Sequence, residues 1–160
     1  MHIIIVHDSA YGNGERLAKI LKEEFEKEGH TAKAEHVSNV DPDHLAAEPP
    51  EMLVLGAAIR RFTSSPATKK WLRRFAKGVK QKGRKPAFAA LFVTHALPLH
   101  WADRWGKRLL KRLERSGAAE RVYKEWLSGR VTSVEGPLEE TADPAFRDHA
   151  RELLEAAVPR

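Results

Sequence analysis

The residues with the clearest chemical potential follow the first apolar run of the chain. Residues 3–6 are Ile, Ile, Ile and Val, an unbroken stretch typical of a parallel strand that is covered on both faces. Ser9, Gly12 and Gly14 come next, and a helical pattern begins near Gly14. A helix in that position points unpaired backbone N–H groups and the positive end of its dipole at the turn. With the Ser9 hydroxyl and the backbone freedom of the glycines, this arrangement predicts a phosphate-binding loop.

The loop matches neither of the two commoner phosphate motifs. It lacks the Gly-Lys-Ser/Thr ending of a P-loop and the three-glycine spacing of a dinucleotide-binding fingerprint. The alternative reading is an ordinary strand-to-helix turn whose glycines serve geometry alone. Asp8 would repel a phosphate if its side chain faced the loop, so we expect its carboxylate to turn away or to bond to the backbone.

Residues 9–14 resemble the FMN phosphate loop of the flavodoxin-like family. That loop usually consists of a hydroxyl residue, two variable residues, a glycine, a variable residue and a threonine. This chain has Gly14 where threonine is common, so one hydroxyl donor is missing while the backbone donors remain. The resemblance covers essentially the whole chain and implies FMN as the cofactor.

Two further segments resemble the loops that flank the flavin ring in this family. Residues 56–62 contain a glycine, small residues and an Arg-aromatic pair, as in flavodoxin-like quinone reductases and menaquinone-dependent protoporphyrinogen oxidases. Residues 94–101 occupy the place of the second loop, where a histidine could donate a hydrogen bond or shuttle a proton. The predicted cofactor-binding residues are Ser9, Ala10, Tyr11, Gly12, Asn13 and Gly14 in the first segment, Ala57, Ala58, Ile59, Arg60, Arg61 and Phe62 in the second, and Thr94, His95, Ala96 and Leu97 in the third.

The pattern of apolar residues predicts alternating strands and helices. Strands are expected at residues 3–6, 31–37, 52–56, 86–93 and 122–127, and helices after each of them, the second being a loop or short helix over 41–50. This alternation predicts an α/β fold with a doubly wound five-stranded parallel sheet. The resemblance to the flavodoxin-like family implies that the strands lie in the order 2-1-3-4-5. The strongest apolar runs fall at the three central positions of that order. Residues 60–65 are expected to form a polar loop, and residues 77–85 are expected to form a basic loop. Residues 128–140 cannot be assigned to a helix or strand from the sequence.

Composition limits the chemistry that the chain can perform. The 160 residues, 18.0 kDa, suit a single domain over residues 1–160, and no run approaches the roughly 18 apolar residues of a membrane span, so we expect a cytoplasmic protein. The absence of cysteine excludes disulfides, thiolate ligands and thiol mechanisms, so redox chemistry needs a bound cofactor. No metal site is expected, because His95 and His100 do not share a helix face and lack a third ligand nearby.

The net charge of +6 creates a field that attracts acidic proteins, nucleic acid or anionic lipid surfaces, although runs of basic residues also occur as solvated helix faces. Six basic residues fall on the helix expected after residue 100, namely Arg104, Lys107, Arg108, Lys111, Arg112 and Arg115. We expect an FMN-binding redox protein that meets an acidic redox partner protein. The residues leave open a quinone-linked flavin oxidoreductase of the protoporphyrinogen oxidase type, acting on a small quinone-like acceptor at an anionic membrane surface. A basic module for nucleic acid or anionic surfaces is a further alternative, although the chain has no recognisable nucleic-acid motif.

Overall fold

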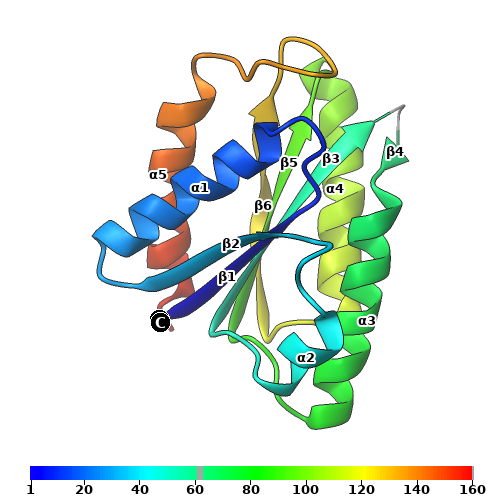
Figure 1. The fold of residues 1–160 in the computed structure, drawn as a ribbon, viewed down its shortest axis with the longest axis vertical. Coiled ribbons are helices and arrows are strands. Elements are labelled where there is room, and N and C mark those ends of the chain that lie inside the picture. The colour runs from blue at the N-terminus through cyan, green and yellow to red at the C-terminus, as the bar shows by residue number, and fades with distance from the viewer. Residues whose placement is uncertain (61–62, 160) are drawn as a thin grey trace.

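Five parallel strands form the centre of the protein, whose computed structural model describes residues 1–60 and 63–159. Their spatial order is β2 (Thr31–His36), β1 (His2–His7), β3 (Met52–Arg60), β5 (Phe88–His95) and β6 (Arg121–Arg130) (Figure 1). Counted along the chain, these parallel strands lie in the order 2-1-3-4-5, so the predicted doubly wound topology is confirmed. The strands β1, β3 and β5, which are buried except for His2 and Arg60 at their ends, take the central positions because both of their faces are covered.

Helices cover both faces of the sheet. One face carries α1 (Asn13–Lys27) and α5 (Ala142–Ala157), and the other carries α2 (Pro42–Ala47), α3 (Pro66–Lys82) and α4 (Leu99–Ser116) (Figure 1). Successive side chains of a strand point to opposite faces. Ile3 and Ile5 therefore join the core beside α1 and α5, whereas Ile4 and Val6 join the core beside α3 and α4. None of the helices in the described part of the chain is long and apolar enough to cross a membrane.

The segment after Gly56 differs from the prediction. Instead of leaving the sheet before a polar loop at 60–65, the chain continues β3 to Arg60. A two-residue strand, β4 (Thr63–Ser64), then lies antiparallel to the end of β3. The extension comes from pairing with a distant segment, since the small apolar residues after Gly56 still pair with β5 as far as Ala58.

The prediction of a basic loop over residues 77–85 is wrong for its first part, because α3 continues to Lys82. Leu72, Phe75 and Val79 are buried at helical spacing, so the apolar face of α3 extends one turn further than expected. The helix ends at Gly83, which adopts the left-handed conformation with φ of 66°.

Residues 131–138 form a hairpin, in the segment that the sequence left unassigned. Val131 and Leu138 make an isolated antiparallel bridge, and the Thr132 N–H donates to the Pro137 carbonyl at 2.9 Å. Val131 and Leu138 are buried and join the core beside α1 and α5. The hairpin directly follows β6 and therefore lies at the carboxyl edge of the sheet, above the strands in Figure 1.

Candidate functional site

The carboxyl ends of β1, β3 and β5 border one cavity of about 770 Å³. Its walls are the segments that follow these three strands, together with the hairpin of residues 131–138. Ligands of doubly wound sheets bind at this edge, where the strand order reverses, and the reversal here falls between β1 and β3. The volume lies within the range of about 300–1,000 Å³ typical of cofactor and small-molecule sites.

The first wall is the turn between β1 and α1. Gly12 takes the N-cap position of α1 with φ of 86°, and no side chain caps the helix. The first helical bond of this turn runs from the Arg16 N–H to the Gly12 carbonyl at 2.9 Å, so the helix itself does not use the N–H groups of Asn13, Gly14 and Glu15. Ser9 lies directly against Gly14. These backbone donors and the Ser9 hydroxyl suit a phosphate group.

Asp8 is buried at the base of this turn and is turned away from it. Its Oδ1 accepts a hydrogen bond from the Ala58 N–H at 2.9 Å, and its Oδ2 accepts one from the Thr68 hydroxyl at 2.7 Å. The expectation that this carboxylate bonds to the backbone is therefore confirmed. Because both oxygens are engaged by β3 and α3, the acidic group supports the turn without presenting its lone pairs to an anion.

The second wall is the end of β3 with β4. Arg60 lines the cavity, and its guanidinium donates to the Asp8 carbonyl at 2.8 Å, which fixes a positive charge beside the first turn. Ala58 and Ile59 line the same wall, whereas the side chain of Ala57 faces the core beside α3 and α4. Side chains alternate along the strand, so Ala58 points to the face opposite Ala57. Ile59 shares the face of Ala57 but lies nearer the end of β3, where it borders the cavity. The predicted residues Arg61 and Phe62 lie outside the described residues.

The third wall follows β5 and contains a buried histidine. The ring of His95 is 1% exposed, with Nδ1 3.2 Å from the Leu97 carbonyl and Nε2 2.7 Å from the Ser128 hydroxyl. A carbonyl only accepts, so Nδ1 carries the proton and Nε2 of the neutral ring accepts from Ser128. Burial lowers the pKa of His95 below its ordinary value, and Arg130 lowers it further, against the opposing effect of the Leu97 carbonyl. His95 is thus held as a neutral ring whose nitrogens both have partners within the protein.

The hairpin of residues 131–138 is a fourth wall, which the sequence did not predict. Val131 and Val134 line the cavity, and the Asn13 side-chain amide donates to the Glu135 carbonyl at 3.1 Å. A Cβ on Gly136 would approach that amide to 2.7 Å, so the hairpin and the start of α1 fit closely. No local signal reveals this contact, because Asn13 and Glu135 are separated by 122 positions.

Most of the residues predicted from the sequence meet in this cavity. Gly12 and Ala57 do not line it, and four residues beyond the prediction, Thr63, Pro66, Val131 and Val134, do. The predicted residues that line the cavity are Ser9, Ala10, Tyr11, Asn13, Gly14, Ala58, Ile59, Arg60, Thr94, His95, Ala96 and Leu97.

The sequence matches the family model of flavodoxin over residues 5–125. The chain therefore belongs to the flavodoxin family, an FMN-binding family of redox proteins. No curated protein sequence matches the chain significantly.

Solved structures agree with the family. Oxidised flavodoxin 1 from Bacillus cereus has a TM-score of 0.71 at 16% identity, with 97% of this chain and 98% of that chain covered. A WrbA-like flavodoxin from Agrobacterium tumefaciens has a TM-score of 0.72 at 16% identity, with 98% and 96% covered. Rubredoxin:oxygen oxidoreductase from Desulfovibrio gigas has a TM-score of 0.74 at 18% identity, with 98% of this chain but 36% of that longer chain covered. At these identities the likeness establishes the fold.

The cavity fits the chemistry of FMN at both ends. At the phosphate end, the uncapped first turn of α1 and the Ser9 hydroxyl provide donors, and the acceptor oxygens of Asp8 point elsewhere. At the other end, the apolar side chains of Ile59, Leu97 and Val131 provide contact surface for an aromatic ring system.

Proposed function

We propose that this protein is an electron carrier in which the cavity at the carboxyl edge of the sheet holds FMN. Residues 9–14 bind the phosphate, while residues 58–60, residues 94–97 and the hairpin of residues 131–138 flank the ring. Bound FMN supplies reversible one- and two-electron transfer, and the protein contributes binding, orientation and electrostatics. The four walls limit access of water, and Arg60 places a fixed positive charge near the site.

The observation that favours a carrier over an enzyme for small substrates is the state of His95. Among the described residues that line the cavity, His95 is the one imidazole, and there is no carboxyl or amino group. Its ring is buried, neutral and hydrogen-bonded at both nitrogens. A general acid for the reduction of a quinone-like substrate would need a proton available to that substrate. Transfer of electrons to another protein has no such requirement.

The charge of the protein favours an acidic partner. The net charge of +6 creates a field that speeds encounter with negatively charged proteins and weakens as salt screens it. We therefore propose exchange with an acidic redox protein. The quinone-linked oxidoreductase at an anionic membrane surface is the competing function, and one experiment separates the two.

The experiment measures electron transfer from the dithionite-reduced, FMN-loaded protein by stopped-flow absorbance. Its acceptors are an acidic ferredoxin-type protein of sufficiently high potential and, separately, the small quinone menadione. We expect fast oxidation by the acidic protein, with a rate that falls steeply between low and high salt. Rapid, salt-independent turnover with menadione and slow electron exchange with the acidic protein would contradict the carrier function. That result would support the quinone-linked oxidoreductase.

A further inference from the structure

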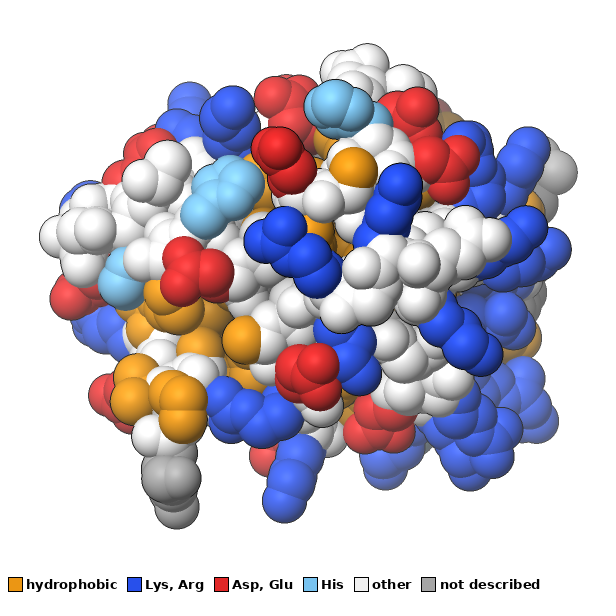
Figure 2. Space-filling model, turned by 90° about the horizontal axis from the view of Figure 1, so that it is seen from below, with side chains coloured by type: hydrophobic (Ala, Val, Ile, Leu, Met, Phe, Trp, Pro, Cys, Tyr) orange, Lys and Arg blue, Asp and Glu red, His pale blue; other side chains and the backbone are white. Residues whose placement is uncertain are grey.

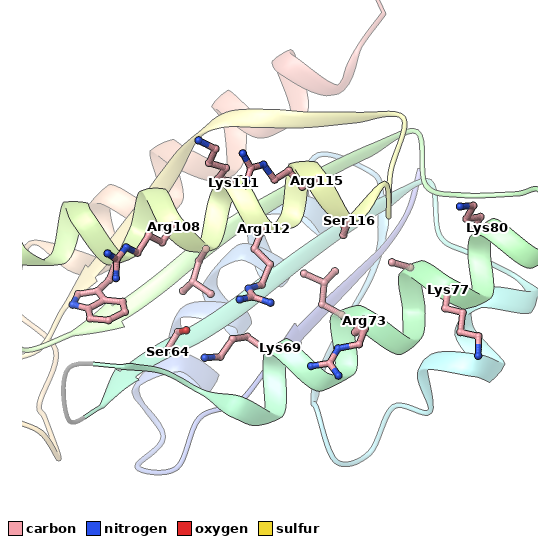
Figure 3. Close-up of a pocket in the computed structure, with 14 residues that line it drawn as sticks. Ser64, Lys69, Arg73, Lys77, Lys80, Arg108, Lys111, Arg112, Arg115 and Ser116 are labelled. Carbon is pink, nitrogen blue, oxygen red and sulfur yellow. The ribbon is translucent and has the colours of Figure 1, made fainter.

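A second large cavity lies between α3 and α4, outside the candidate flavin site. It is an open groove of about 870 Å³, called here the basic groove (Figure 3). Ser64, Leu72, Ala76, Trp105, Leu109 and Ser116 also line it. The cationic residues that line it are Lys69, Arg73, Lys77 and Lys80 of α3 and Arg108, Lys111, Arg112 and Arg115 of α4.

The charges of the basic groove are unbalanced. Its lining contains eight Lys and Arg residues and no Asp or Glu, and none of the eight forms an ion pair with another described residue. Two cations outside the groove on the same helices are paired: Arg74 of α3 with Asp41 and Asp43, and Lys107 of α4 with Asp103, whereas Lys70, Lys82 and Arg104 form no ion pair with another described residue. Figure 2 shows Lys and Arg gathered along the right side of the molecule, the side that carries α3 and α4 in Figure 1. The groove therefore attracts an anionic ligand along its whole length.

The floor of the basic groove is apolar. Leu72, Ala76 and Leu109 are buried at the bottom, and Trp105 is half-buried with the Arg108 guanidinium 4.9 Å from its ring centre. Figure 3 shows Arg112 projecting from α4 and Lys69 from α3 into the space between the two helices. An occupant that fits must combine an apolar ridge with negative charge on both flanks.

The groove and the flavin cavity share one wall. Thr63 lines the flavin cavity, and its neighbour Ser64 lines the basic groove. The two residues form β4, where successive side chains point to opposite sides. A molecule in the basic groove therefore lies directly beside the proposed redox site.

From this geometry we propose that the basic groove binds an acidic amphipathic helix of the redox partner protein. The proposal rests on the proposed function and specifies how the partner docks. The cations of α3 extend from Lys69 to Lys80, about 16 Å or three helical turns. An amphipathic helix lays its apolar face into a groove and keeps its charged residues at the rims, which matches the floor and walls described here.

The shape of the groove argues against other anionic partners. A membrane surface is flat, but the apolar side chains here lie at the bottom of a groove rimmed by cations. Double-stranded DNA is too wide to enter the space between two packed helices. Single-stranded nucleic acid binds by stacking on several aromatic residues, and Trp105, the one aromatic residue among those lining the groove, is covered by Arg108.

The test uses synthetic probes and measures binding by fluorescence anisotropy. The first probe is a 14-residue peptide with Leu at helical spacing and Glu at the flanking positions. The second has the same composition in an order that breaks the apolar stripe. Phosphatidylglycerol vesicles and a single-stranded oligo(dT) are the other probes. The groove variant is Arg73→Gln, Lys77→Gln and Arg112→Gln, and the control is Lys19→Gln, Lys33→Gln and Lys124→Gln, which removes equal charge from exposed positions elsewhere.

We expect the amphipathic peptide to bind at least tenfold more tightly than the rearranged peptide. The groove variant should lose about tenfold in affinity for it, and the control variant less than threefold. Equal affinity for both peptides, equal loss in both variants, or tighter groove-dependent binding of vesicles or oligo(dT) would overturn the proposal. FMN titration of the same variants keeps the two ideas separate, because the groove proposal can fail while FMN binding and electron exchange persist.

Discussion

Asp8 and Thr68 join the end of β1 to the first turn of α3 through a 2.7 Å hydrogen bond between the Asp8 Oδ2 and the Thr68 hydroxyl. The other carboxylate oxygen holds the Ala58 N–H of β3. One buried side chain at the base of the proposed phosphate turn thereby connects the end of β1 to β3 and α3. Residues of this kind determine whether the loops are preorganised before a ligand arrives.

Removing this carboxylate should destabilise the protein. Asp8→Ala leaves a buried N–H and a buried hydroxyl without their acceptor, and we expect a loss of about 2–4 kcal/mol in the free energy of unfolding. Asp8→Asn keeps an acceptor for Ala58 and should lose less than half as much. Urea denaturation measures both, with the exposed Asp148→Ala as the control. Equal losses for Asp8→Ala and Asp8→Asn would contradict the role assigned to these two bonds.

The phosphate loop predicts selectivity for FMN over riboflavin. Ser9→Ala removes one donor to a charged group, worth about 1.5–3 kcal/mol, so FMN affinity should fall roughly 10- to 100-fold. Affinity for riboflavin, which has no phosphate, should stay nearly constant. Titration of the apoprotein by flavin fluorescence gives both constants, and Ser38→Ala on another surface is the control. Equal losses of affinity for FMN and riboflavin would show that Ser9 does not contact the phosphate.

Gly12→Val tests the conformation of the same loop. The φ of Gly12 is 86°, and a Cβ there would meet no other atom within 4 Å, so the penalty comes from the backbone and not from packing. A β-branched residue should rearrange the turn and abolish tight FMN binding while circular dichroism shows the fold retained. Undiminished FMN affinity would show that the turn does not need the left-handed conformation.

The buried histidines predict that stability decreases in mild acid. Burial lowers the pKa of His95, and burial together with repulsion from His36 lowers the pKa of His7. The unfolded chain takes up protons near pH 6.5 while the folded protein still holds both rings neutral. Stability is therefore fully present above about pH 6.5 and is lost as the pH falls toward the lowered pKa values.

His95→Gln tests this pH dependence. The variant should flatten the plot of unfolding free energy against pH below 6.5, relative to the unmutated protein. Urea denaturation at several pH values gives both slopes. An unaltered slope in His95→Gln would mean that His95 takes up its proton over the same pH range in the folded protein and in the unfolded chain.

Arg60 predicts the direction of a change in redox potential. Its guanidinium is fixed by the Asp8 carbonyl and lines the cavity, and a nearby positive charge favours the anionic reduced form of a flavin. Arg60→Gln should lower the midpoint potential by on the order of 50 mV. Lys33→Gln, which removes a charge from the β2 edge, should change it far less. Potentiometric titration measures the midpoint potentials of both variants. An upward shift in Arg60→Gln would show that Arg60 does not stabilise the reduced flavin.

The sequence alone predicted which strands lie at the centre of the sheet, because an unbroken apolar run is local information. The order 2-1-3-4-5 itself followed from the resemblance to the flavodoxin-like family. Unbroken apolar runs mark strands that are covered on both faces, and the three strongest runs indeed occupy β1, β3 and β5. The turn at residues 9–14 was equally local, since a strand, a hydroxyl, two glycines and a helix start follow one another within the chain. Asp8 could be predicted to turn away because the repulsion between two anions does not depend on the rest of the fold.

Only the tertiary structure determined the remaining walls of the site. The hairpin of residues 131–138 reaches the cavity through the contact of Asn13 with Glu135, and the facing of Ala57 into the core depends on how far β3 pairs with β5. The basic groove likewise exists because α3 and α4 pack beside each other and bring two separate runs of Lys and Arg together. These features depend on contacts between residues far apart in the chain, and a local pattern of side chains carries no record of such contacts.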